Sequence, residues 1–443
     1  MWHILLFVLC SCQSSTPKDS KSTQQPTVAQ STPQSKQLPQ ENKSSEPPTQ
    51  KGTATGRYSH QNIGELALSP PSREAKVTKA IELSDAHLAT KTFLEQHLRA
   101  HASSSDNPWA LFHSLLAFGA DHHTDSGELA VDAILSRYAV VVEHNGKPLL
   151  SLPSSVEKEG QKILIEPHAD LGLKVLTEIG LSPDHPIQVN GEAYRFQDLY
   201  AGSLLSTYLL PQQNISSYHS TNDMPWGIQA LSAYAPTDLR WMSTDRTVPM
   251  TMDDLTLFGI AVLAGETQFM KATKQAGAAF ERKGQGIFKY TCGGAHLLQG
   301  ISYAVARGFG GPKARPEIEA QIELLYYRFP IELQIYDSTL QAAPKHKRKL
   351  LVQRLKFVGH FIESTAKLHA LGFYTPNDQQ LAMIKGAADQ LALVVQALRQ
   401  EGVFEDLEQI KSQDPQMYLD LLGDAGHAVY ALDLMSGQKA ILY

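Results

Sequence analysis

Apolar residues recur at steps of three and four over much of the chain, which is the spacing of one buried helix face. Six apolar side chains follow this spacing within residues 381–398, shortly after Asn377, a residue type that begins helices. A second such run stops at Gly372, and a third begins near Cys292 and stops at residues 308–312, where Gly and Pro gather. Since Gly and Pro end helices, the pattern predicts a mainly helical protein.

Two short segments have strand patterning instead. An Asn-Gly pair lies between Ile/Val and Tyr/Phe residues in 187–196, and a second Asn-Gly pair lies within residues 140–150. Asn-Gly supplies the positive φ angles of a tight two-residue turn between antiparallel strands. We therefore expect small β-hairpins inserted into a helical scaffold.

Histidines recur beside glycines at regular intervals. His296, His360 and His427 are 64 and 67 residues apart, and each closely follows a glycine. This pattern predicts three helix starts, and the Pro-Trp pairs in 107–109 and 224–226 predict two more. A period near 60 to 65 residues fits two helices with their loops. Repeated helix pairs stack as an open α-solenoid or close into a ring.

The composition predicts a globular body. Of 443 residues, 42% are hydrophobic and 19% are charged, with a formal net charge of −6. This provides enough apolar material for a large core, and it argues against the Lys- and Arg-rich surface of a nucleic-acid-binding protein. No continuous apolar run approaches the ~18 residues of a membrane-spanning helix, and three cysteines are too few for a disulfide framework.

The first 57 residues differ from the rest of the chain. Apolar residues 4–9 precede Cys10 and Cys12, and 29 of the 44 residues from 13 to 56 are Ser, Thr, Gln or Pro. Such a segment buries too little apolar area to offset the entropy of ordering it. We therefore predict an extensible tether at 13–57 and a folded helical domain at 58–443.

The N-terminus resembles a bacterial lipoprotein signal, because Leu9 lies three residues before Cys12. The resemblance implies that residues 1–12 are a signal, that Cys12 is acylated and enters a lipid bilayer, and that Cys10 is the alternative acceptor. Gln13 follows Cys12, which in this family implies the outer membrane of the bacterial cell envelope. The alternative is an incidental apolar N-terminus.

Residues 286–295, Gly-Ile-Phe-Lys-Tyr-Thr-Cys-Gly-Gly-Ala, resemble the helix start repeated in the α/α toroids. These are the terpenoid cyclases, the protein prenyltransferase β subunits and, more distantly, the lanthionine synthetases. The resemblance implies a mainly α fold, an α/α toroid of repeated helix pairs whose inner helices begin around a central cavity. His296, His360 and His427 would then converge there.

Four residues form a candidate zinc site: Cys292, His296, His360 and His427. Cys292 and His296 are spaced i and i+4, which is one face of a helix. Cys, His and Asp are the ligands that zinc takes, and catalytic sites use three of them plus water; Asp424 offers a nearby carboxylate. The alternative is that the glycines allow tight packing and the histidines cap inner helix ends.

Asp253 and Asp254 are a second candidate for chemistry. Residues 251–256, Thr-Met-Asp-Asp-Leu-Thr, are similar to the acid motif with which class II terpene cyclases protonate substrates. Asp-Asp before an apolar run is equally a helix N-terminus, where carboxylates cap free amides. His122 and His123 follow a glycine, and we interpret them as a surface turn.

The chain contains no glycine-rich phosphate loop, nucleophile elbow or His-Glu-x-x-His pair. Two function classes therefore stay open. The domain either binds an envelope protein or a glycan, or has a structural role; alternatively it is an envelope enzyme, possibly zinc-dependent, whose central site uses the Cys/His set with Asp253, Asp254 or Asp424 as carboxylates.

Overall fold

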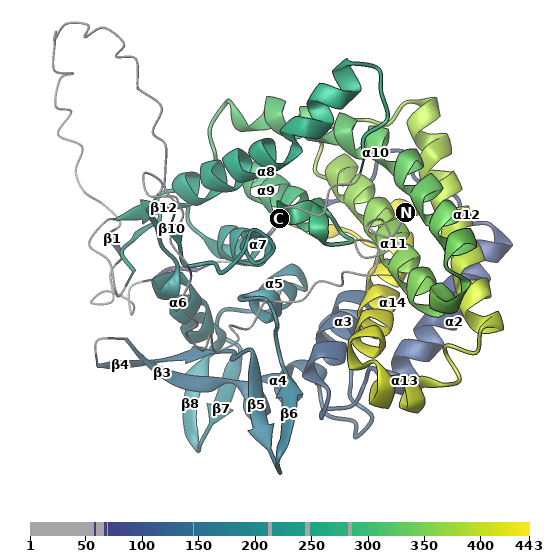
Figure 1. Cartoon of the computed structure of the whole chain (residues 1–443). Coiled ribbons are helices and arrows are strands. Elements are labelled where there is room, and N and C mark those ends of the chain that lie inside the picture. Colours follow the sequence, from purple (N-terminus) through teal and green to yellow (C-terminus); the bar gives the residue numbers. More distant parts are fainter. Residues whose placement is uncertain are drawn as a thin grey trace, which may run out of the picture.

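The computed structural model describes residues 57–58, 66–68, 70–144, 146–210, 215–243, 249–281 and 286–443 (Figure 1). The predicted signal, Cys10, Cys12 and nearly all of the tether lie outside these residues.

The described chain is mainly helical, as the apolar spacing predicts. The helices are α2 (Asp85–His101), α3 (Pro108–Phe118), α4 (Ala130–Tyr138), α5 (Leu171–Glu178), α6 (Phe196–Ser206), α7 (Met224–Tyr234), α8 (Met252–Gln275), α9 (Ala295–Ala306), α10 (Ala314–Ala342), α11 (Lys347–Ala370), α12 (Asp378–Gln400), α13 (Leu407–Gln413) and α14 (Pro415–Met435).

Six of these helices contact one another in a closed cycle: α3 with α5, α5 with α7, α7 with α9, α9 with α11, α11 with α14, and α14 with α3. Other helices pack against this cycle from outside, with α8 against α9, α10 and α12 against α11, and α2 against α14 (Figure 1). The chain alternates between the two sets, so each inner helix follows an outer one. The core therefore lies between two layers of helices.

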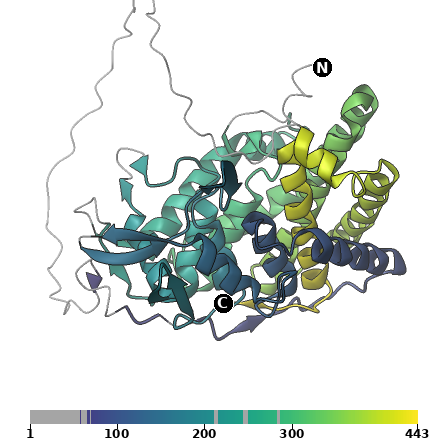
Figure 2. The same ribbon diagram turned by 90° about the horizontal axis from the view of Figure 1, so that it is seen from below.

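The strands are short and pair mostly as two-stranded hairpins. They are β1 (Arg57–Tyr58), β2 (Glu74–Ala75), β3 (Val140–His144), β4 (Lys147–Ser151), β5 (Ser155–Lys158), β6 (Gln161–Leu164), β7 (Pro186–Val189), β8 (Glu192–Arg195), β9 (Leu209–Leu210), β10 (Ile215–Ser216), β11 (Arg240–Trp241), β12 (Met250–Thr251) and β13 (Ile441–Leu442). The hairpins β3–β8 gather on one side of the molecule in both views (Figures 1 and 2).

Both predicted hairpins are confirmed, as β3–β4 and β7–β8. In the second, Asn190 and Gly191 have φ angles of 54° and 84°, which is the positive region that the turn requires. A third hairpin, β5–β6, was not predicted. Its turn uses Glu159 and Gly160, with φ angles of 55° and 75°, and Glu lacks the short side chain that usually marks such turns.

The predicted helix boundaries at α12 and α11 are confirmed. Asn377 caps α12, since its side chain accepts from the Gln380 amide while the Gln380 side chain accepts from the Asn377 amide. Gly372 follows the end of α11 with a φ of 74°. The two Pro-Trp pairs likewise begin α3 and α7. These boundaries follow from local chemistry, which explains why sequence predicts them well.

The prediction that His360 and His427 mark helix starts is wrong. His360 lies in the middle of α11, and His427 lies in the middle of α14. Gly426 serves helix packing instead, because a Cβ there would lie 2.7 Å from the His113 carbonyl oxygen, whereas a Cβ on Gly359 would lie at an ordinary 3.8 Å from the Ala428 backbone. Glycine beside His427 therefore reflects close helix contact rather than a boundary.

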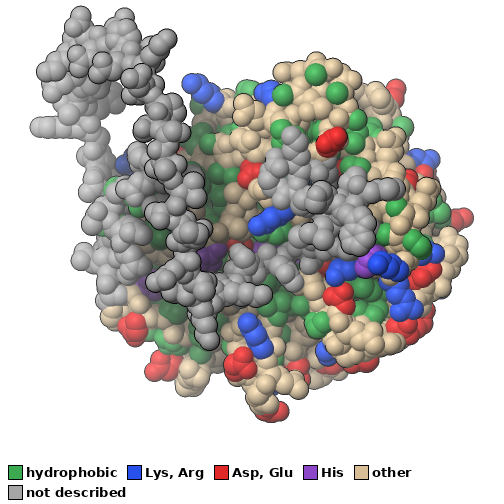
Figure 3. All heavy atoms as spheres, in the orientation of Figure 1, with side chains coloured by type: hydrophobic (Ala, Val, Ile, Leu, Met, Phe, Trp, Pro, Cys, Tyr) green, Lys and Arg blue, Asp and Glu red, His purple; other side chains and the backbone are tan. Residues whose placement is uncertain are grey.

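By length and mean hydropathy alone, α12 is apolar enough to cross a membrane. Core helices share this property, and one face of α12 is buried against α11 and α2. On the face shown in Figure 3, acidic and basic side chains of the described residues are interspersed. In the basic cluster at 345–349, Lys347, Arg348 and Lys349 pair with Glu401, Asp406 and Asp414, so these charges already have partners.

Candidate functional site

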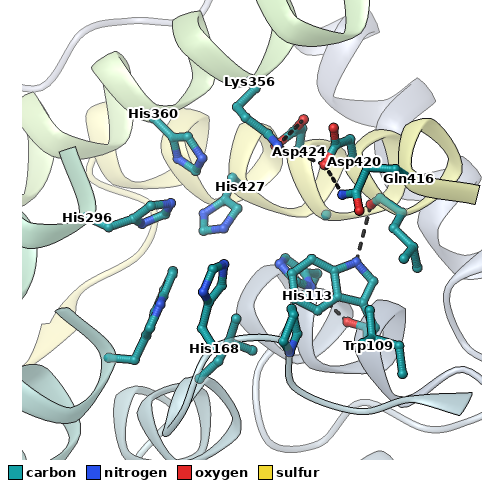
Figure 4. Close-up of a pocket in the computed structure, with 16 residues that line it drawn as sticks. Trp109, His113, His168, His296, Lys356, His360, Gln416, Asp420, Asp424 and His427 are labelled. Carbon is teal, nitrogen blue, oxygen red and sulfur yellow. Dashed lines mark hydrogen bonds and ion pairs between the residues drawn. The ribbon is translucent and has the colours of Figure 1, made fainter. Parts of the chain in front are cut away.

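A cavity of about 280 Å³ lies at the centre of the helix cycle (Figure 4). All six inner helices contribute to its walls. The lining residues are Trp109, His113, Leu164, Pro167, His168, Leu171, Trp226, His296, Lys356, His360, Gln416, Leu419, Asp420, Gly423, Asp424 and His427.

Four helices point their N-terminal ends at this cavity. Trp109, Leu171, Trp226 and His296 each belong to the first three residues of α3, α5, α7 and α9. A helix N-terminus has unpaired amides and a partial positive charge. The helices α11 and α14 instead pass along the cavity: α11 contributes residues from its middle turns, and α14 contributes residues from Gln416 in its first turn to His427 in its middle.

His296, His360 and His427 meet at one point of the cavity wall. One ligand atom from each lies within 4.8 Å of the other two, and the ring centroids are 4.3, 4.4 and 5.6 Å apart. Tetrahedral zinc with Zn–N bonds of ~2.0–2.1 Å places nitrogen ligands ~3.3 Å apart. The three imidazoles thus need only a small inward movement to bind one ion.

A single buried carboxylate orients two of these imidazoles. The Nδ1 atoms of His427 and His360 lie 2.8 and 3.3 Å from Oε2 of Glu363. A carboxylate accepts, so both Nδ1 atoms donate their protons to it and the Nε2 lone pairs remain for a metal. Burial alone would raise the pKa of Glu363, but Lys367, His427 and His360 hold this pKa well below its usual range.

Burial keeps the imidazoles of His296, His360 and His113 neutral. Desolvation lowers the pKa of His360 to about 3 and also lowers that of His113 to about 3. It lowers the pKa of His296 well below the usual value, and the neighbouring His360 lowers it further. Neutral imidazole is the form that binds metals, so His296 and His360 have the protonation state that a metal requires near pH 7.

Beneath the histidines lies a buried network of two lysines and two glutamates. Lys367 Nζ lies 2.7 Å from both Glu178 Oε1 and Glu363 Oε1, and Lys174 pairs with Glu178. The Tyr430 hydroxyl donates to Glu178 at 2.8 Å. Two positive and two negative charges compensate one another, so the network adds no net charge beneath the histidines.

A second charged group lies on the wall formed by α11 and α14. Lys356 Nζ lies 2.9 Å from Asp420 Oδ1 and 3.8 Å from Asp424 Oδ2. Gln353 and Gln416 also donate to Asp420, at 2.9 Å each. Asp424, three residues before His427 on α14, is therefore the predicted carboxylate that the structure places in the cavity.

Cys292 lies outside the three-histidine group, and among the described residues no Cys, Asp or Glu joins that group. Its Sγ donates to Asn222 Oδ1 at 3.9 Å. The i, i+4 argument assumed a continuous helix from Cys292, but α9 begins at Ala295 after two glycines with positive φ. That turn removes Cys292 from the helical face of His296.

Asp253 and Asp254 lie at the exposed start of α8 and do not line the cavity. Asp254 and Thr251 form a reciprocal capping box, and Asp253 Oδ1 accepts from the Gly310 amide at 2.6 Å. These contacts match the capping alternative. The turn after α3 contains His122, whose Nε2 lies 3.2 Å from Ser103 Oγ, and His123.

Sequence reasoning missed several cavity residues. His168, which no sequence motif marked as a candidate, lines the cavity and pairs with Asp223 at 2.7 Å. Glu363 and Lys367, which lie next to the histidines, could have been noticed only as an i, i+4 pair of opposite charges inside an apolar helix. Such pairs are usually exposed, so the spacing by itself does not indicate burial.

Comparisons with known protein families, with curated proteins and with solved structures find no match to this chain.

Proposed function

We propose that this protein is a metal-dependent enzyme of the bacterial cell envelope, with one zinc ion held by His296, His360 and His427. One observation supports this above all: three imidazoles from three helices meet in an accessible cavity, with one carboxylate orienting two of them. Histidines that pack together by chance need no such partner. A histidine that binds a metal usually donates its other ring N–H to a carboxylate, a carbonyl or water.

The fold that we propose for this site is an α/α toroid. The closed cycle of helix contacts, including that between α14 and α3, supports a ring. An open solenoid would separate its first and last repeats. The alternation of outer and inner helices along the chain, and the helix N-termini at the cavity, also favour the toroid.

The proposed chemistry is hydrolysis by activated water. Three histidine ligands would leave the charge of a bound zinc ion uncompensated, and zinc in such a site with an open position would lower the pKa of bound water to about 7. Asp424 lines the same cavity and would accept a proton, while Lys356 would stabilise negative charge developing on a substrate.

The test is metal content in the purified full-length chain after loading with Zn²⁺. We expect one zinc per chain by mass spectrometry, falling to near zero in His360→Ala and His427→Ala, because two ligands hold zinc poorly. Cys292→Ala and His185→Ala, a histidine that pairs with Asp132 outside the cavity, should retain the metal. Circular dichroism verifies that each variant is folded.

A parent protein without zinc would overturn this proposal and favour the binding or structural role. Zinc retained in both His→Ala variants would place the metal elsewhere. Loss in Cys292→Ala at unchanged circular dichroism would show that the thiol is a ligand.

We also propose that the acylated Cys12 anchors the domain to the outer membrane, with 13–57 as tether. Expressed in a bacterium, Cys12→Ala should leave the membrane fraction or keep its signal uncleaved, because acylation precedes cleavage in the lipoproteins it resembles. Cys10→Ala is the matched control and should remain anchored. Membrane fractionation with the mass of the N-terminal peptide measures both, and an unchanged distribution of Cys12→Ala would contradict the proposal.

A further inference from the structure

A second cavity, of about 160 Å³, lies near the start of α5 and contains two carboxylates, Glu166 and Asp170. Hydroxyl groups dominate the rest of its polar lining, from four serines, Thr207 and Tyr218. No Lys, Arg or His lines it.

Glu166, which is buried, and Asp170, which is partly buried, differ from most of the buried acids among the described residues. Glu178, Glu363, Glu332 and Asp420 each pair with a lysine or arginine. Among the described residues, Glu166 and Asp170 form no ion pair with any basic side chain. An uncompensated buried carboxylate is costly, and burial raises the pKa of Asp170 to about 6 and that of Glu166 well above its usual value.

Helix capping accounts for Glu166. Its Oε2 accepts from the Gly172 amide at 2.8 Å, and its Oε1 accepts from the Asp170 amide at 3.3 Å. These amides belong to the start of α5, where a carboxylate is favourable. Capping does not account for Asp170, whose side chain accepts from Ser203 Oγ at 2.6 Å through Oδ1 only.

Asp170 Oδ2 and the Tyr218 hydroxyl face the same space. A Cβ built on Gly227 would contact both of these oxygens. The Tyr218 side chain is only 9% exposed, and no hydrogen bond of normal geometry reaches its buried hydroxyl, beside which Thr207 lies. Asp170 also adopts a left-handed φ of 66°, which costs a non-glycine residue energy and occurs preferentially at functional sites.

We propose that this second cavity binds a divalent cation, Ca²⁺, with Asp170 Oδ2 and the Tyr218 hydroxyl among its ligands. Oxygen ligands alone select a hard cation, and Ca²⁺ accepts irregular sets of oxygens completed by water. The bound charge would compensate both carboxylates. This site is separate from the three histidines, so it does not depend on the zinc proposal.

The test is titration calorimetry of the metal-stripped full-length chain with CaCl₂. We expect one Ca²⁺ per chain in the parent and an affinity at least about tenfold lower in Asp170→Asn, because the charged ligand is lost. Asn tolerates the left-handed backbone, so this variant should fold. Tyr218→Phe keeps the ring and should weaken binding by a smaller factor.

Asp184→Asn, an exposed surface substitution, is the matched control and should bind as the parent does. No saturable Ca²⁺ binding in the parent, or equal affinity in Asp170→Asn, would overturn the site. Tighter binding of Mg²⁺ or of methylammonium than of Ca²⁺ would overturn the choice of Ca²⁺ as the bound cation. Zinc content is measured separately, so failure here leaves the three-histidine proposal intact.

Discussion

Methionine in place of Lys367 is expected to lower the free energy of unfolding by about 3–5 kcal/mol. Lys367 is only 4% exposed and lies between Glu178 and Glu363, at 2.7 Å from each. Burial alone would lower the pKa of this lysine, but the two carboxylates raise it, so the ammonium is charged. Its removal leaves Glu178 paired with Lys174 and leaves Glu363 without a lysine partner among the described residues.

The magnitude follows from what remains after the substitution. Methionine fills a similar volume, so little of the loss arises from a cavity. Most of it arises from the uncompensated charge on Glu178 and Glu363, whose desolvation is no longer offset. The double variant Lys367→Met with Glu178→Gln should therefore be more stable than the sum of the two single losses predicts.

Guanidinium denaturation followed by circular dichroism measures the change. Lys274→Met is the matched control, because Lys274 pairs with Glu323 at the surface and such pairs contribute ~0–1 kcal/mol. A loss below about 1 kcal/mol in Lys367→Met would show that the buried network contributes no more than a surface ion pair.

Alanine in place of Gly300 should destabilise the protein by about 1–3 kcal/mol, although alanine is the better helix former by ~1 kcal/mol. Gly300 lies on α9, where it faces α7. A Cβ at this position would lie 2.5 Å from the Pro225 carbonyl oxygen and 3.2 Å from Pro225 Cα. Backbone atoms cannot rotate away, so the two helices must separate.

Gly386→Ala provides the control of opposite sign. Gly386 is on α12, and a Cβ there would meet nothing within 4 Å. The only remaining effect is the higher helix propensity of alanine than of glycine, so this variant should be more stable than the parent by up to ~1 kcal/mol. Denaturation midpoints of the two variants on the same side of the parent value would contradict the close-contact explanation for Gly300.

Gly300→Ala should also weaken zinc binding in the proposed site. Pro225 precedes Trp226, whose ring lies 4.5 Å from that of His296. Separation of α7 and α9 would thus move one wall of the histidine cluster. A loss of stability with unchanged zinc affinity would show that the cluster adjusts independently of this contact.

The sequence by itself determined the helical class, two of the hairpins and the main helix boundaries. Each depends on contacts within a few residues. Asn377 caps its own helix, Gly372 ends one through its own φ angle, and the Asn-Gly pair at 190 and 191 forms a turn from its own backbone. Such features can be predicted from a single sequence because their physical causes are local.

Only the tertiary structure decided how the histidines meet. His360 and His427 come together from the middle of α11 and α14 rather than from helix starts, because these two helices pack side by side. Their common partner Glu363 is 64 residues from His427, and Glu178 reaches Tyr430 across 252 residues. The spacing of residues along the sequence does not show which side chains this far apart come into contact. Burial then decided the protonation of His296 and His360, since burial depends on every helix packed around them.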